Sequence, residues 1–300
     1  MNVITQNVKV IFHQRNINSY LFQMLKLIQL NCLMFTYFEE LLKFLKSQDA
    51  DIINLQEATT GNILEFSNGK YLEKLANELN MQIIYAPFTT NESQDKQLDW
   101  FGNAILTRLN IIDYGIHWLH NGQAEAGKIT FEENQRLQQA VKINRNSAYP
   151  IVYNQPKNLV WALLSHNGKV CRNITTHFTA TQKCTETLQM IQEAQKVCDF
   201  IDNQKDLPTF LTGDLNIHQG AGCIANLKTK LELVNQDTLN TLTPSIHQIF
   251  LPKYQQLDPN LKDGLSVDYV FQKYIKINQF EILNVKISDH LPIVVEFELE

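Results

Sequence analysis

The sequence lacks several features that mark particular protein classes. It has only five cysteines in 300 residues, and no two of them form a C-x-x-C pair: Cys32, Cys171, Cys184, Cys198 and Cys223. This odd, scattered set favours neither a disulfide framework nor a zinc knuckle, so a reducing compartment is the simpler interpretation. No G-x-x-x-x-G-K-[ST] phosphate loop is present, and no nucleotide cofactor is expected.

A charge excess and a long apolar run are also missing. The formal net charge of -5, from 26 basic and 31 acidic residues, weakens the case for a long nucleic acid held by overall charge. No secretory signal is visible, and the apolar stretch 21–38 is interrupted by Gln23, Lys26, Gln29 and Asn31. We expect this stretch to be buried or half-buried and not to span a membrane. The expected location is cytoplasmic, or exported without a visible signal peptide.

The chain contains enough apolar residues for a sizeable core, at 44% of the sequence. No repeat, low-complexity tract or linker divides it, so one domain over residues 1–300 is expected. Strand-like runs begin near residues 3, 51, 82, 103, 159, 170, 208, 267 and 292. Helical patterns fall at about 37–47, 70–80 and 183–203. The pattern predicts a mixed α and β fold.

Local signals refine two of these helices. Thr36 and Glu39 form a T-x-x-E pattern that predicts a capping box at the start of the first helix. The third helix carries an apolar stripe, which consists of Thr185, Leu188, Ile191, Ala194, Val197 and Ile201. The polar stretches 117–135 and 243–266 are interpreted as long surface loops and are candidates for substrate contact.

Polar side chains follow an apolar strand in "PTFLTGDLNIH". If the strand stays extended, Asp214 and Asn216 share one face with Phe210 and Thr212, because side chains alternate along a strand. A carboxylate at the edge of a buried row needs a cationic or hydrogen-bonding partner. The pattern therefore indicates a site at the end of this strand.

A second carboxylate, Glu57, ends the run "DIINLQE", with Ile53 and Leu55 on the same predicted face. Taken alone, such a residue most often simply reaches solvent. The combination with the other strand ends is what favours a functional role.

Asp268 in "SVDYVF" lies opposite Val267, Tyr269 and Phe271, so a central strand would bury it and it needs a donor. His290 in "SDHLPIVVEF" is the candidate donor, since a histidine oriented by a buried aspartate can act as a base near neutral pH. His177, at the end of "VCRNITTHF", is a second histidine at a strand end. Hard oxygen ligands with few histidines suit Mg²⁺ or Mn²⁺ better than Zn²⁺.

In this order the motifs resemble the Mg²⁺-dependent endonuclease/exonuclease/phosphatase superfamily, which includes DNase I-like nucleases, sphingomyelinases and phosphatases. The matching segments are "TQNV" with Asn7, "INLQE" with Glu57, "GNAILTR" at 102–108, "TTHF" with His177, "TGDLNIH" with Asp214 and Asn216, "VDYVF" with Asp268, and "SDHLPIVVEF" with Asp289 and His290. The resemblance implies a four-layer αββα sandwich (α/β, or α+β), in which two mixed β-sheets pack face to face with helices outside.

The resemblance also implies roles for these residues. Glu57 would bind the metal with help from Asn7 and Asp289. Asp214 and Asn216 would position or activate water and hold the phosphate, Asp268 would orient His290, and His177 would contact the phosphate or assist the leaving group. Arg136 and Asn103 are weaker candidates for substrate binding.

Three functions fit these motifs. The first is a phosphoesterase of a small or lipid phosphoester, similar to sphingomyelinases, with "AYPIVY" at 148–153, including Tyr149 and Tyr153, near the site or against a membrane. The second is a nuclease, which would need one rim of basic residues: Lys128, Arg136, Lys142, Arg145 and Lys169. The third is an inactive binding module. "THFTAT" at 176–181 departs from the Tyr and Pro-Asn pattern of abasic-site endonucleases and argues against that branch. Possible partners beyond the phosphoester are therefore a nucleic acid or a membrane lipid.

Overall fold

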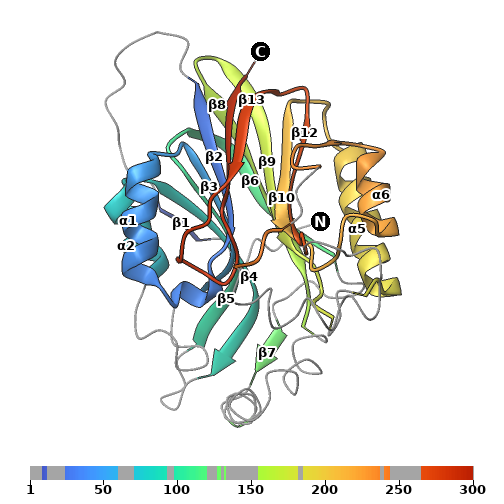
Figure 1. Ribbon diagram of the computed structural model, residues 1–300, viewed down its shortest axis with the longest axis horizontal. Coiled ribbons are helices and arrows are strands. Elements are labelled where there is room, and N and C mark those ends of the chain that lie inside the picture. The colour runs from blue at the N-terminus through green and yellow to red at the C-terminus, as the bar shows by residue number, and fades with distance from the viewer. Residues whose placement is uncertain are drawn as a thin grey trace, which may run out of the picture.

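The computed structural model describes residues 9–11, 24–59, 71–92, 98–119, 127–129, 132, 155–181, 185–236, 240–243 and 265–299. Across these residues, two β-sheets pack face to face and helices cover the outer face of each (Figure 1). This confirms the α/β fold of four layers. Asn7, Arg136, the segment 148–153 and most of the two predicted loops lie outside the described residues.

The first sheet has the order β1-β4-β5-β3-β2-β14-β13, with β7 also paired to β4. Its strands are β1 (Lys9–Ile11), β2 (Leu25–Asn31), β3 (Ile52–Thr59), β4 (Gln82–Glu92), β5 (Leu98–Thr107), β7 (Gly127–Ile129), β13 (Lys276–Ile282) and β14 (Ile293–Glu298). β2 and β3 are parallel, whereas β14 is antiparallel to β2. The carboxyl ends of β2 and β3 therefore meet the segment that leads into β14.

The second sheet has the order β11-β12-β10-β9-β8-β6. Its strands are β6 (Asn110–Trp118), β8 (Asn158–His166), β9 (Lys169–His177), β10 (Thr209–Asp214), β11 (Glu232–Leu233) and β12 (Asp268–Lys273). The register places Asp214 beside His177 of parallel β9 and beside Asp268 of antiparallel β12. Three residues from distant parts of the sequence thus lie side by side at one end of the sheet.

Helices α1 (Phe38–Gln48) and α2 (Tyr71–Leu79) cover the first sheet. The α1 range confirms the helix expected at 37–47, but the predicted capping box does not form. Tyr37 is the N-cap residue without a side-chain cap bond, and the Thr36 hydroxyl donates to the carbonyl of Leu33 instead. Thr36 ends the short 3-10 turn η1 (Leu33–Phe35) with a helical backbone conformation, φ -54° and ψ -32°, whereas an N-cap residue has a non-helical one.

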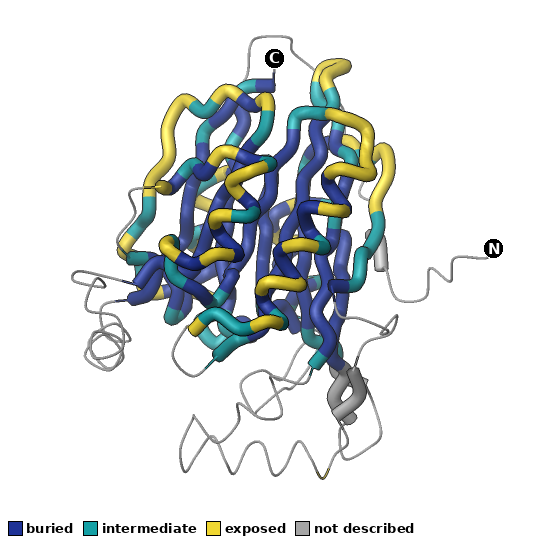
Figure 2. The backbone as a smooth tube through the Cα atoms, turned by 90° about the vertical axis from the view of Figure 1, so that its right-hand side faces the viewer, coloured by how far each residue is buried: buried dark blue, intermediate teal, exposed yellow. Residues whose placement is uncertain are grey.

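Helices α5 (Leu188–Asp202) and α6 (Gly222–Lys228) cover the second sheet (Figure 2). The predicted stripe on α5 is only partly correct. Leu188 and Ile191 are 70% and 42% exposed, whereas Met190 faces the core with Ala194 and Val197. The helix begins only after its N-cap residue Thr187, so Thr185 lies outside it. The side chains of Leu188 and Ile191, in its first turn, point outward.

Sequence reasoning missed α6 and several strands, notably β2, β6 and β13. The seven residues of β2 lie inside the apolar stretch 21–38, where a continuous run hides the period of two. The strands β6 and β13 are at sheet edges, and most of their residues are exposed or half-buried. Such strands lack the alternation that marks a strand with one buried face.

Three apolar clusters hold the layers together. One packs α1 and α2 against the first sheet, one packs α5 and α6 against the second, and one lies between the sheets. Between the sheets, the rings of Phe210 and Phe297 meet edge to face with centroids 4.8 Å apart. Among the described residues, no helix is both long and apolar enough to cross a bilayer.

Candidate active site

The carboxyl group of Asp214 lies at the centre of the candidate site. It is buried at the end of β10, where its Oδ2 accepts a hydrogen bond from the side-chain amide of Asn31 at 3.0 Å. Its Oδ1 accepts from the backbone N–H of Asn216 at 2.9 Å. A carboxyl group from the second sheet is therefore held partly by the first sheet, because Asn31 is the last residue of β2.

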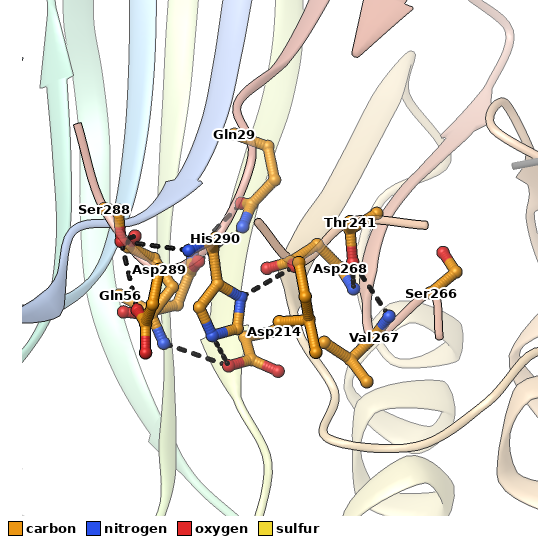
Figure 3. A network of polar contacts seen from close by, with 12 residues as sticks. Gln29, Gln56, Asp214, Thr241, Ser266, Val267, Asp268, Ser288, Asp289 and His290 are labelled. Carbon is orange, nitrogen blue, oxygen red and sulfur yellow. Dashed lines mark hydrogen bonds and ion pairs between the residues drawn. The ribbon is translucent and has the colours of Figure 1, made fainter. Parts of the chain in front are cut away.

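Two histidine rings face the same oxygen of Asp214. The Nε2 atoms of His177 and His290 lie 3.6 Å and 3.7 Å from Asp214 Oδ2. On its other side, the His290 ring donates from Nδ1 to Asp268 Oδ2 at 2.8 Å (Figure 3). This confirms that Asp268 is buried and that His290 is its donor. The site also brings together Asp214 of β10, His177 of β9 and Asp268 of β12, which are catalytic candidates from three strands.

Burial and neighbouring charges give the two histidines opposite protonation states. Burial alone would lower the pKa of His290, but the carboxylates of Asp268 and Asp214 outweigh it and hold this pKa well above its ordinary value. The pKa of His177 lies well below its ordinary value because of burial, the Lys157 charge and His290. At neutral pH the site thus contains one imidazolium and one neutral imidazole.

Burial raises the pKa of Asp214 to about 7, although the nearby charge of His290 opposes the shift. A carboxyl group that gains and loses its proton near neutral pH can act as a general base there.

Backbone contacts from two further segments fix the Asp268–His290 pair. The hydroxyl of Thr241 accepts from the N–H groups of Val267 and Asp268 at 3.0 Å and 3.1 Å. Ser288 donates to the carbonyl of Asn31 at 2.6 Å and accepts from the N–H of His290 at 3.2 Å. Sequence reasoning did not single out Thr241 or Ser288, since a lone serine or threonine carries no pattern that identifies such a contact.

Simple alternation predicts that Glu57 shares a face with Ile53 and Leu55, but the structure shows that it does not. Those two side chains pack toward α1 and α2, whereas the β3–β5 register shifts between Leu55 and Ala58 and Glu57 has a φ of 54°. A bulge of this kind changes the direction of a side chain. Glu57 is half-buried. Burial lowers the pKa of Lys157, which precedes β8 of the other sheet, and the charge of Glu57 is one of those that oppose this shift.

Asn216 also departs from the extended geometry that the sequence suggested. The strand β10 ends at Asp214, and Asn216 lies beyond it with a φ of 52°. Its side-chain amide donates to the carbonyl of Phe178 at 3.1 Å, while its backbone N–H contacts Asp214. Asn216 thus ties the end of β10 to the segment after His177.

Of two other candidates, Asn103 and Asn7, only Asn103 lies within the described residues. Asn103 is buried, and its amide donates to the side chain and the backbone carbonyl of Asn158 at 3.1 Å each. Asn7 lies outside the described residues. At the end of β2, beside β3, it is Asn31 that contacts Asp214, and sequence reasoning had noted Asn31 only as a polar interruption of an apolar stretch.

The basic rim required by the nuclease interpretation is incomplete. Lys169 begins β9 and donates to the carbonyl of Leu299 at 2.6 Å, so it lies at the opposite end of that strand from His177. The structure therefore contradicts its place on a rim around the site. Arg136, Lys142, Arg145 and the side chain of Lys128 lie outside the described residues.

The donor set fits a divalent cation. Asp214, Asp268 and His290 offer ligand atoms within 4.8 Å of one another and could hold a metal ion. Among the described residues, Asp268 Oδ1 is a buried oxygen without a hydrogen-bond partner. Two further carboxylates, Glu57 and Asp289, are half-buried. Asp289 directly precedes His290, and the charges of Glu57 and Asp214 both act on Lys157. Carboxylate oxygens are the ligands that Mg²⁺ and Mn²⁺ prefer.

Comparison with solved structures identifies the fold. An endonuclease/exonuclease/phosphatase from Bacteroides vulgatus matches with a TM-score of 0.64 and 14% sequence identity, over 93% of this chain and 100% of that one. A mannosyl-6-phosphatase from Bacteroides thetaiotaomicron matches with a TM-score of 0.58 and 15% identity, over 91% of this chain and 99% of that one. The human Nocturnin catalytic domain matches with a TM-score of 0.58 and 15% identity, over 92% of this chain and 94% of that one.

The sequence itself provides no comparable match: no protein-family model and no curated protein matches it. The chain nevertheless has the endonuclease/exonuclease/phosphatase (DNase I-like) fold over nearly its full length, as the sequence motifs had predicted.

Proposed function

We propose that this protein is a divalent-metal-dependent phosphoesterase that hydrolyses its substrate by in-line attack of an activated water. The observation that carries the proposal is the arrangement around Asp214 Oδ2, which has two histidine Nε2 atoms within 3.7 Å and the amide of Asn31 at 3.0 Å. A base, an imidazolium and a neutral imidazole at one point can serve both the attacking and the leaving oxygen.

In this proposal Asp214 accepts the proton of the attacking water. Its pKa of about 7 suits this role, since a base is most effective when its pKa lies near the working pH. The sequence had suggested His290 as a base, but a ring whose pKa lies well above its ordinary value favours a different role. As an imidazolium, His290 stabilises the negative charge that develops on the phosphate oxygens.

The remaining residues position these groups. Asp268 accepts from Nδ1 of His290 and holds the ring with Nε2 toward Asp214. His177 is neutral and can donate from one nitrogen to the phosphate or the leaving oxygen. Asn216 fixes Asp214 through its backbone N–H, and its side-chain amide holds the segment that follows His177.

Glu57 and Asp289 are the residues that we propose to hold a Mg²⁺ or Mn²⁺ ion, as the family resemblance implies. Asp268 and His290 hydrogen-bond to each other, which favours an orienting pair over joint ligation by both. The bound ion would neutralise charge on the phosphate oxygens. Asn7 stays a prediction in this role.

The proposed substrate is a small or lipid phosphoester. The net charge of -5 and the position of Lys169, far from the site, both weaken the alternative of a nuclease. A structural neighbour named as a mannosyl-6-phosphatase is consistent with a small substrate. An inactive binding module is the weakest alternative, because it would be expected to lose part of the Asp214, Asp268, His177 and His290 set.

A metal-dependent activity panel tests the proposal. The purified protein is offered bis-p-nitrophenyl phosphate, p-nitrophenyl phosphate, sphingomyelin, plasmid DNA and RNA with Mg²⁺, Mn²⁺ or EDTA. Hydrolysis of a small or lipid ester that EDTA abolishes and salt barely changes is the expected result. Cleavage confined to nucleic acid and falling steeply with salt would favour the nuclease. No turnover of any phosphoester would refute the proposal.

A further inference from the structure

Lys157 is a buried cation that the proposed mechanism does not use. It immediately precedes β8 and is only 1% exposed, and its backbone carbonyl accepts from the N–H of Leu119. Within the described part of the chain, no carboxylate lies within ion-pair distance of its ammonium group. Burying an ammonium group without such a partner costs free energy, which suggests that Lys157 has a function at this position.

The ammonium group of Lys157 lies against the candidate site. It sits 4.5 Å from the centre of the Phe88 ring, and the same ring meets His177 edge to face at 6.0 Å. The charges of Glu193, Glu57 and Asp214 all act on Lys157, and the charge of Lys157 in turn acts on His177. Lys157 is therefore beside the residues assigned to metal binding and catalysis.

These neighbouring carboxylates have other hydrogen-bond donors. Glu193 on α5 accepts from the backbone N–H and the hydroxyl of Thr179 and from the amide of Gln189. Asp214 accepts from Asn31 and from the backbone of Asn216. Among the described residues, no hydrogen bond or ion pair joins the ammonium of Lys157 to Glu193 or Asp214, and an ammonium group can donate up to three hydrogen bonds to an anion.

We propose that Lys157 binds a nonbridging oxygen of the substrate phosphate, an inference that rests on the phosphoesterase function proposed above. The cation–π contact with Phe88 and the surrounding negative charges hold the ammonium in place before substrate arrives. Binding then replaces distant charge interactions with a direct, charge-assisted hydrogen bond.

Kinetics of Lys157→Met with p-nitrophenyl phosphate and bis-p-nitrophenyl phosphate test this inference. Methionine keeps the length of the side chain and removes its charge. Because the lost contact exists in both the ground state and the transition state, we expect KM and the Ki of inorganic phosphate to rise about ten- to a hundredfold, with a smaller change in kcat. Lys157→Arg should retain most of the affinity. The matched control is Lys169→Met, which removes an ammonium group from the opposite end of β9 and should leave KM and Ki unchanged.

A purely structural role for Lys157 gives different results. If the ammonium only balanced Glu193, Lys157→Met would lower the Tm without changing KM or Ki, and Glu193→Gln in the same chain would restore the Tm. That result would overturn the inference, as would failure of both Lys157 variants to fold. If the wild type hydrolyses no phosphoester, calorimetry of inorganic phosphate binding still decides: equal affinity for wild type and Lys157→Met overturns the inference, whereas weaker binding by the variant supports it.

Discussion

The two halves of the interface between the sheets differ in chemistry. Along one face of each parallel strand, apolar residues come first and amides or hydroxyls follow, and in three of the four strands a site residue ends the row. The rows are Leu25, Leu27, Gln29 and Asn31 on β2; Ile52, Asn54 and Gln56 on β3; Cys171, Asn173, Thr175 and His177 on β9; and Phe210, Thr212 and Asp214 on β10. The polar half leads to the site, and the apolar half lies at the other end.

The polar half is hydrogen-bonded across the sheets. Gln56 bonds to Gln29 and donates to Thr175 at 2.7 Å, and Asn54 and Asn173 exchange bonds at 3.0 Å and 2.7 Å. Such bonds contribute little net stability but require one alignment of the two sheets. The apolar half stabilises without fixing direction. The difference teaches that stability and the geometry of the site come from opposite ends of one interface, and the following changes test this.

The largest expected effect is at the proposed metal ligand. Glu57→Gln should abolish hydrolysis and leave the fold intact, because it removes the charge that binds the cation while keeping the size of a half-buried side chain. EDTA should have the same effect on the wild type. Activity with p-nitrophenyl phosphate esters and circular dichroism are the measurements, and Glu40→Gln on the exposed face of α1 is the control. An active Glu57→Gln protein would contradict the assignment of Glu57.

The next largest effect concerns the orienting pair. Asp268→Asn and His290→Ala should each lower kcat by about 10²- to 10⁴-fold, and the double variant should be no slower than the worse single variant, because Asp268 acts only through the ring that it holds. Steady-state kinetics of all three variants form the test. A double defect equal to the product of the single defects would show that the residues work independently.

A core substitution should lower stability and leave kcat nearly unchanged, whereas the preceding variants should lose activity. Phe210→Ala removes a fully buried ring that packs on Phe297 and should reduce the free energy of unfolding by about 3–5 kcal/mol. Its kcat per folded molecule should stay near that of the wild type, since Phe210 lies at the apolar end of its row. Denaturant unfolding and activity measured on the same sample check both parts. A large loss of kcat with little loss of stability would contradict the division between the halves.

Much of the fold could be predicted because its central strands show simple patterns. Asp268 and His290 were paired correctly, since a buried carboxylate and a histidine at a strand end leave few other partners. Three helices were found within a few residues of their ends, although α5 starts at Leu188 instead of 183. These predictions needed only periodicity and the cost of burying charge.

The parts that sequence reasoning missed depend on contacts across the fold. Either Asn7 or Asn31 could end the first motif strand, and only the parallel pairing of β2 with β3 places Asn31 beside Asp214. The bulge at Glu57 breaks the alternation that was used to orient it. Lys157 precedes a strand like many surface lysines, and its burial follows from segments distant in sequence.

The pH dependence of stability probes the cost of placing a carboxyl group in the polar half. Burial raises the pKa of Asp214 to about 7, far above the value of a carboxyl group in the unfolded chain. A raised pKa means that the folded state holds its proton more tightly, so the associated stability is present at low pH and is lost as pH rises through about 7. In EDTA, the stability of the wild type relative to Asp214→Asn should fall by ~2–3 kcal/mol between pH 5 and pH 8. Thermal unfolding at several pH values measures it, and a flat difference would show that Asp214 stays ionised throughout.

The smallest effect is expected at the amide pair of the polar half. Asn54→Leu leaves the buried amide of Asn173 without its partner and should cost about 1–3 kcal/mol, the penalty of an unsatisfied polar group. Adding Asn173→Leu removes both amides, and Thr212, which loses the bond from Asn54, keeps its bond to Thr175. Stability should therefore return to within ~1 kcal/mol of the wild type. If the polar half serves to align the sheets, this stable double variant should still lose several-fold in kcat, since Asn31 and Asp214 meet from opposite sheets. Unfolding curves and kinetics of the single and double variants separate these outcomes, and a double variant with full stability and full kcat would show that the amide pair has no part in aligning the site.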